Sequence, residues 1–171
     1  YVVEKDRGGD HAEAIGLLRR IYAMEGVSSD AQVRLAAAES LGHFGDAAGL
    51  DYAIGKVRVQ GDQVDVIQVR VAAVRALQAI GSAKGLPALE ALASSRLRGR
   101  FHAAEAIVTI KARGIPTVPE RIEYLRAILE GGGGPDQRYE AAFRLIKMRN
   151  RDALRVAIDA ARDKKNPGHT E

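Results

Sequence analysis

A short pattern recurs four times along this chain and constrains its fold more than any other feature. Each copy has an arginine, an alanine three places later, and a large aliphatic residue four places after that. The copies begin at Arg34, Arg70, Arg100 and Arg138. The arginines are spaced by 36, 30 and 38 residues, which is the range of stacked repeat arrays and much longer than a coiled-coil heptad. One such unit cannot bury its apolar face alone, so the repetition predicts a solenoid of stacked units.

Each unit is predicted to consist of two helices. The copies themselves have apolar residues at helical spacing: Val33, Ala37, Leu41 and Phe44 in the first, and Val69, Ala73, Leu77 and Ile80 in the second. Another amphipathic stretch precedes each copy or follows the last, at about 10–24, 47–59, 86–93, 119–129 and 153–161. The predicted fold is an all-α, right-handed solenoid of four to five units, each with a helix A, a short turn and a helix B.

The 171 residues are predicted to form one domain. We expect repeats at roughly 10–45, 46–81, 82–113 and 117–149, then a capping helix at 150–163 and a flexible tail at 164–171. Gly45 and Gly81 follow helix B, where glycine favours the left-handed cap, and Asp30 and Asp136 are predicted to cap the starts of B helices. Two connections interrupt the period: residues 58–68 predict a short loop or a longer helix A, and residues 131–135 predict a flexible glycine-rich connection.

The repeated pattern, Asp-x-x-Val-Arg-x-x-Ala-Ala-x-x-Leu-Gly, resembles HEAT-like repeats of the bilin-lyase type. Residues 30–46 and 69–92 match it most clearly, and the resemblance extends over about 10–162. In that family the repeated arginine is structural and ties helix B to a neighbouring turn. The resemblance therefore implies a scaffold role for Arg34, Arg70, Arg100 and Arg138. We expect backbone carbonyls or an acidic neighbour to hold Arg70, with a loss of about 1–3 kcal/mol on replacement by alanine.

The amino-acid composition argues against several kinds of catalytic and metal site. The chain has no cysteine, hence no disulfide, thiolate nucleophile or cysteine-based zinc site. His102 and Glu105 are one helical turn apart, but they form only half of a metal site, and the His-Glu dipeptides of HEAT-like hydroxylases are missing. The tryptophans of HEAT-like DNA glycosylases are also missing, and the repeat alone does not make a bilin lyase. We therefore predict a non-catalytic protein without cofactor or metal.

The cellular location of the protein is predicted from similarly general features of the sequence. The sequence has no run of 18 apolar residues, so we expect no membrane-spanning helix. The lack of cysteine fits a reducing compartment, and the Ala-, Gly- and Arg-rich composition suggests a high-GC genome. We expect a cytoplasmic bacterial protein. Because the sequence starts at Tyr1 without a methionine, we expect further repeats or another domain upstream.

The residue after each repeated arginine is the main candidate for partner binding. In the family pattern this position is polar and faces solvent, on B helices that line the concave side. Here it is apolar in all four repeats: Leu35, Val71, Phe101 and Tyr139. One turn later come Glu39, Arg75, Glu105 and Phe143. An exposed apolar column predicts a surface for an extended or helical peptide, and the alternative is that the column packs between repeats as core.

The formal net charge of +4 leaves a second function open. Basic residues concentrate toward the end of the chain: Arg138, Arg144, Lys147, Arg149, Arg151, Arg155, Arg162, Lys164 and Lys165. They are interpreted as the polar outer face of a terminal repeat, with nucleic-acid binding as the alternative. The predicted function is a protein-interaction scaffold. A HEAT-like lyase or hydroxylase is the third reading of the sequence.

Overall fold

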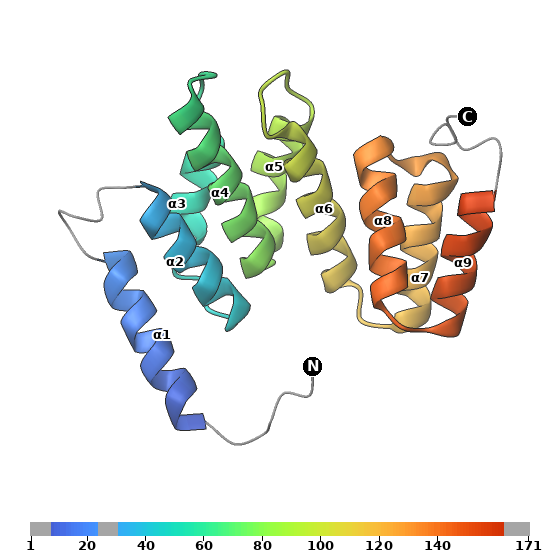
Figure 1. The fold of residues 1–171 in the computed structure, drawn as a ribbon, viewed down its shortest axis with the longest axis horizontal. Coiled ribbons are helices and arrows are strands. Elements are labelled where there is room, and N and C mark those ends of the chain that lie inside the picture. The colour runs from blue at the N-terminus through green and yellow to red at the C-terminus, as the bar shows by residue number, and fades with distance from the viewer. Residues whose placement is uncertain (1–7, 24–30, 163–171) are drawn as a thin grey trace.

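The computed structural model describes residues 8–23 and 31–162, and every regular element within these ranges is a helix (Figure 1). Eight of the elements lie in repeat-like pairs, and a ninth follows them. In chain order they are α1 (Gly8–Ala23), α2 (Ala31–His43), α3 (Leu50–Val57), α4 (Val64–Ile80), α5 (Leu86–Ala93), α6 (Arg100–Gly114), α7 (Val118–Ala127), α8 (Pro135–Lys147) and α9 (Arg151–Arg162). The all-α solenoid predicted from the repeats is confirmed.

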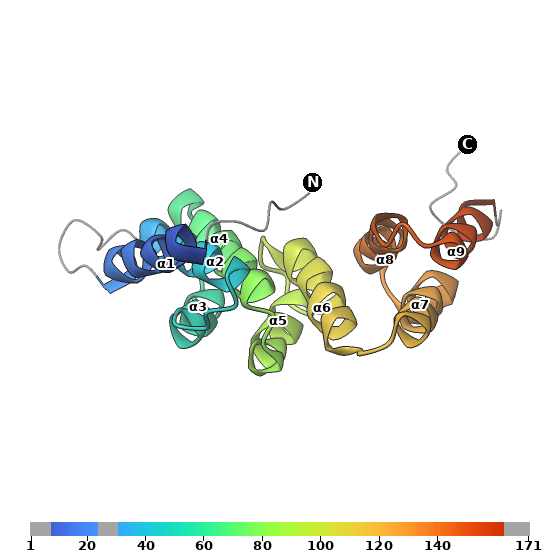
Figure 2. The same cartoon turned by 90° about the horizontal axis from the view of Figure 1, so that it is seen from below.

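The helices form two layers. Each B helix packs against the next, so that α2, α4, α6 and α8 make one row, while α3, α5 and α7 make the second (Figure 2). The array bends so that the row of B helices lies on its inner side. The residues of the repeated pattern therefore lie in the row where the family resemblance placed them. None of the described helices is long and apolar enough to cross a membrane.

The core consists of two clusters that meet at α6. The first cluster joins α2 to α6 and includes Leu77 and Ile107, whereas the second joins α6 to α9 and includes Val108 and Leu145. Consecutive residues of α6 thus belong to different clusters, because the helix lies between two repeats. This arrangement is what a stack of units predicts, since each unit buries its apolar surface against its neighbours.

Local signals explain several helix ends. Gly81 has φ 71° and donates its N–H to the carbonyl of Leu77, which is the left-handed cap expected there. Gly45 also has a positive φ, of 80°. The prediction for Asp136 was wrong: Gly134 occupies the cap position of α8 and Asp136 lies in the first turn, because Pro135 already starts the helix. Asp30 lies outside the described residues.

The two irregular connections differ from each other. Helix α3 ends at Val57 and α4 begins at Val64, so the insertion is a loop, and α4 starts earlier than the period alone requires. After α7 the chain continues through a wider π turn at Ile128–Gly132 and leaves helical geometry at Gly131, with φ 126°. Helical geometry therefore ends where the predicted glycine-rich connection begins.

Helix α2 is rotated relative to its predicted apolar stripe. Val33 and Phe44 are exposed, while Ala37 and Leu41 are buried together with Leu35 and Ala38. The buried face is wide because α2 contacts α1, α3 and α4. The predicted stripe covers only one edge of that face.

Gly42 lets α2 approach α4 closely. A Cβ atom built at Gly42 would lie 2.6 Å from the backbone nitrogen of Ile80 and 2.8 Å from the carbonyl carbon of Ala79. Backbone atoms cannot rotate away as a side chain can, so any larger residue must push the two helices apart. The glycine that follows the large apolar residue of the repeat is therefore a packing residue.

We expect Gly42→Ala to lower the free energy of unfolding by about 1–3 kcal/mol, because overpacking outweighs the gain in helix propensity. Gly55→Ala in α3 is the matched control, since nothing lies within 4 Å of its added Cβ. That change should raise stability by about 0.5–1 kcal/mol. Urea unfolding of both variants measures the difference, and equal effects would show that α2 and α4 are not in close contact.

Candidate functional site

The four apolar residues that follow the repeated arginines do not form one surface. Leu35 is fully buried and Val71 is half-buried, while Phe101 is 51% and Tyr139 is 68% exposed. Leu35 belongs to the core cluster that joins α2 to α6. The predicted column is therefore wrong at Leu35, where the alternative of inter-repeat core holds. Exposure begins toward the C-terminal half of the array.

The second predicted column is also divided. Arg75 is exposed, Glu39 and Glu105 are half-buried, and Phe143 is 39% exposed. The structure adds Ile146, which is 54% exposed. Because Tyr139, Phe143 and Ile146 recur at i, i+4 and i+7, helical periodicity could have identified this stripe opposite the buried Ala141 and Leu145. We call Phe101, Tyr139, Phe143 and Ile146 the apolar surface of α6 and α8.

Two cations accompany the aromatic members of this surface. The guanidinium carbon of Arg100 lies 4.7 Å from the ring centroid of Phe101. The ammonium nitrogen of Lys147 lies 4.6 Å from the ring centroid of Phe143. These distances are within the range of cation–π interactions, so positive charge borders the exposed rings.

The repeated arginine has different surroundings in different repeats. Arg34 stacks on Tyr52, with 4.4 Å from its guanidinium carbon to the ring centroid, and lies 5.2 Å from that of Tyr22. Arg100 is exposed and Arg138 is half-buried, and within the described residues neither side chain donates to a backbone carbonyl as Arg70 does. The prediction of one shared scaffold role is therefore wrong for Arg100, whose side chain contacts Phe101 instead.

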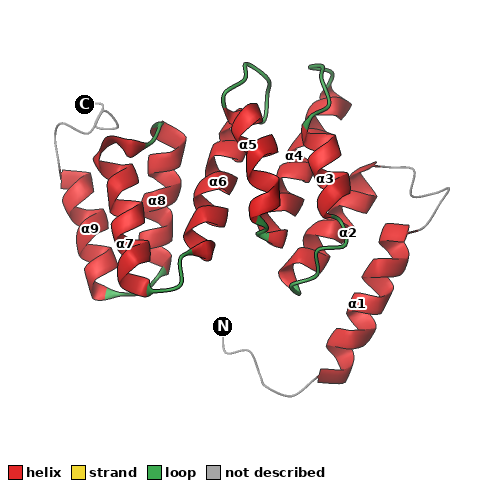
Figure 3. Ribbon diagram, turned by 180° about the vertical axis from the view of Figure 1, so that it is seen from behind, coloured by secondary structure: helices red, strands yellow, loops and turns green. Residues whose placement is uncertain are grey.

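Arg70 is fully buried and bound by carbonyls from two loops. It donates to the carbonyls of Val59 at 2.8 Å and Gly61 at 2.6 Å through one terminal nitrogen. The other terminal nitrogen donates to Arg98 at 2.9 Å. The loops after α3 and α5 lie side by side on the same edge of the array, which lets one side chain reach both (Figure 3). The inserted loop that breaks the repeat period is thus what supplies acceptors to Arg70.

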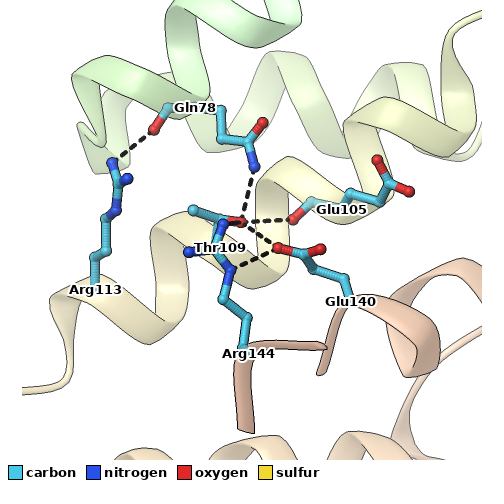
Figure 4. Close-up of polar contacts among 6 residues, drawn as sticks. All are labelled: Gln78, Glu105, Thr109, Arg113, Glu140 and Arg144. Atoms are coloured by element: carbon cyan, nitrogen blue, oxygen red, sulfur yellow. Dashed lines mark hydrogen bonds and ion pairs between the residues drawn. The ribbon is translucent and has the colours of Figure 1, made fainter. Parts of the chain in front are cut away.

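A polar network joins α4, α6 and α8 where the two core clusters meet. Thr109 is fully buried, and its hydroxyl lies 3.0 Å from Nε2 of Gln78 and 3.0 Å from Oε1 of Glu140 (Figure 4). Glu140 is 6% exposed and accepts from Nε of Arg144 at 2.6 Å, while another nitrogen of Arg144 donates to Thr109 at 2.8 Å. Buried polar groups that are fully paired in this way favour one arrangement of the helices.

The sequence did not identify this network. No feature of the sequence singled out Thr109, and Arg144 was interpreted as part of the polar outer face of the terminal repeat. Only the packing of α8 against α6 brings Glu140 and Arg144 to Thr109. A glutamate four places before an arginine is a frequent helical pair and gives no signal of burial.

The histidines do not assemble a metal site in the described ranges. Nδ1 of His102 lies 3.5 Å from Oε2 of Glu105, as their spacing of three residues predicted. No group of three or more His, Cys, Asp or Glu side chains occurs within residues 8–23 and 31–162 in positions to hold a metal ion.

The basic residues of the last repeats lie among acidic ones. A depression beside α9 is lined by Arg149, Arg151, Arg155 and Arg162, together with the carboxylates of Asp152 and Asp159 and the apolar Leu154 and Ile158. Arg155 approaches Asp159 to 4.0 Å. The surface is therefore mixed in charge, whereas a nucleic-acid interface is typically a one-sided basic stripe. Lys164 and Lys165 lie outside the described residues.

Comparison with known proteins identifies the repeat. The family profile described as HEAT repeats matches residues 19–108, which is more than half of the chain. No curated protein and no solved structure gives a significant match. The matched range covers the close packing of α2 on α4 and the carbonyl cage of Arg70. With its stacked helix pairs and this match, the chain belongs to the HEAT repeat proteins.

Proposed function

We propose that this protein is a non-catalytic interaction scaffold that binds a peptide segment of another protein through the apolar surface of α6 and α8. HEAT repeats commonly mediate protein interactions, which supports the general class. The observation that carries the specific proposal is the exposure of Phe101, Tyr139, Phe143 and Ile146 on two adjacent B helices. Exposed apolar clusters mark interaction sites, and aromatic residues are enriched at the centres of interfaces.

The neighbouring charges give this surface a polar rim. Arg100 and Lys147 accompany two of the rings, and Glu105 lies on the same helix as Phe101. Interfaces typically combine an apolar centre with such a rim. The expected ligand is therefore a segment with apolar anchors at regular spacing, either helical or extended.

Peptides selected from a displayed library against the wild-type protein test this proposal. We expect the double variant Phe101→Ser, Tyr139→Ser to weaken their binding by at least about tenfold, which corresponds to about 1.4 kcal/mol, because aromatic anchors carry much of the binding energy at interfaces. Its melting temperature should change little, since both side chains are more than half exposed. Fluorescence anisotropy and thermal unfolding measure the two effects.

The matched control is Val64→Ser, Val118→Ser, which removes exposed apolar side chains from α4 and α7. It should leave peptide affinity unchanged. Equal affinity of the selected peptides for the wild type and for the Phe101, Tyr139 double variant would reject the proposed surface. Binding to DNA or RNA that falls steeply with log salt concentration would favour the nucleic-acid alternative, because phosphate contacts release counterions.

A further inference from the structure

A small pocket lies between α6, α7 and α8, next to the polar network of Thr109. Its volume is about 210 Å³, and its lining includes Thr109 and Met148. Four cationic side chains from the three helices also line it: Arg113, Arg121, Arg144 and Lys147. No carboxylate is among the lining residues. The pocket therefore gathers positive charge from segments that are distant in the sequence.

Little of this charge is neutralised within the described part of the chain. Arg144 forms a salt bridge with Glu140, at 2.6 Å between Nε and Oε1. Arg113 donates instead to the backbone carbonyl of Gln78 at 2.9 Å, and Arg121 to that of Ile115 at 2.7 Å. Carbonyl groups satisfy hydrogen bonds but carry no net charge. The four cations thus have one carboxylate partner between them.

Two further observations indicate that the cations of this pocket are not fully compensated within the described residues. Partial burial, and then repulsion from Arg144, lower the pKa of Arg113, although its guanidinium remains protonated. In addition, Nε of Arg121 is buried and has no acceptor among the described residues. Buried donors of this kind are normally paired, with protein groups, ordered water or a bound ion.

We propose that this pocket binds a compact oxyanion, namely the carboxylate or phosphate group of a ligand. Guanidinium groups present planar pairs of N–H donors that match both oxyanions, and the ammonium of Lys147 adds a further donor and charge. Met148 and the other apolar lining atoms limit the size of the group that enters. The pocket shares only Lys147 with the rim of the apolar surface of α6 and α8, so the oxyanion response and peptide affinity are measured separately on the same variants.

Thermal unfolding in phosphate, acetate or chloride at equal ionic strength and pH tests the pocket. A ligand that binds only the folded state raises the melting temperature, by about 2–4 °C for a chain of this size at five times its dissociation constant. We expect Lys147→Gln to reduce this shift by at least half. Lys84→Gln is the matched control, because Lys84 is exposed and lies outside the pocket, and its response should equal that of the wild type.

A carboxylate supplied by the protein itself gives a second measurement. Met148→Glu places a negative charge among the cations, and Met148→Gln is its neutral counterpart of similar size. The glutamate variant should melt at a higher temperature than the glutamine variant, and it should no longer respond to the added oxyanion. If the arginines only donate hydrogen bonds to carbonyl groups and attract no anion, the two variants will have the same melting temperature, which would contradict the proposal.

The outcomes separate the possible sources of the oxyanion. A shift with phosphate alone identifies a phosphate group, and a shift with acetate as well extends the site to carboxylates such as acidic side chains. The proposal is overturned if neither ion raises the melting temperature. It is also overturned if Lys147→Gln and Met148→Glu respond to phosphate as strongly as the wild type, because the ion then binds elsewhere.

Discussion

Replacing Arg70 with alanine is expected to lower the free energy of unfolding by about 2–4 kcal/mol. Hydrogen bonds to a charged group contribute about 1.5–3 kcal/mol, and removing the donor leaves part-buried carbonyls without a partner. Arg70 is fully buried and bonds to the carbonyls of Val59, Gly61 and Arg98. The loss should therefore reach or exceed the upper part of the range expected from the sequence.

Urea unfolding measures this effect, and Arg100→Ala provides the matched control. Arg100 holds the same position in its repeat but is exposed, so its loss should change stability by less than about 0.5 kcal/mol. Arg70→Lys should be intermediate, because an ammonium group cannot reach the carbonyls of both loops as the guanidinium fork does. If Arg70→Ala lowered the free energy of unfolding as little as Arg100→Ala, the three carbonyl contacts of Arg70 would not contribute to stability as proposed.

The second large effect is expected for Leu35→Ala, at about 3–4 kcal/mol. Leu35 has no exposed surface and lies in the cluster that joins α2 to α6. Truncating a buried leucine removes its transfer free energy and leaves a cavity that the surrounding helices fill only in part. This change affects folding, although the sequence pattern placed Leu35 in a partner-binding column.

Phe101→Ala is the control from the same column of the repeat. Phe101 is 51% exposed, so its truncation should cost less than about 1 kcal/mol despite the larger side chain. Chemical denaturation of both variants gives the comparison. If Phe101→Ala were the more destabilising change, Phe101 would belong to the core and the apolar surface of α6 and α8 would lose its central residue.

These two comparisons locate the candidate binding surface within the array. The first repeat uses the column for packing at Leu35, and Val71 of α4 is half-buried. Helices α6 and α8 present Phe101 and Tyr139 to solvent. Helices α2 and α4 approach closely through Gly42, whereas α6 and α8 have the polar side chains of Thr109 and Glu140 between them. The packing between successive B helices therefore differs along the array, and equivalent residues differ in exposure.

The sequence alone determined the helical architecture and much of its local detail. The repetition predicted paired helices, because each pattern buries a stripe that needs a neighbour. The glycines that follow helix B predicted left-handed caps, and Gly45 and Gly81 have positive φ angles. The repeat pattern also indicated that Arg70 is held by backbone carbonyls, and the structure places it among three of them.

Only the tertiary structure decided which equivalent positions are buried. Leu35 and Phe101 occupy the same place in their repeats, yet one is core and the other is exposed, because burial depends on the distance and rotation of the next helix. The network around Thr109 and the cationic pocket beside it arise in the same way, from residues of three helices that meet across a repeat boundary. Periodicity describes one helix at a time, whereas these sites are made by the contact between helices.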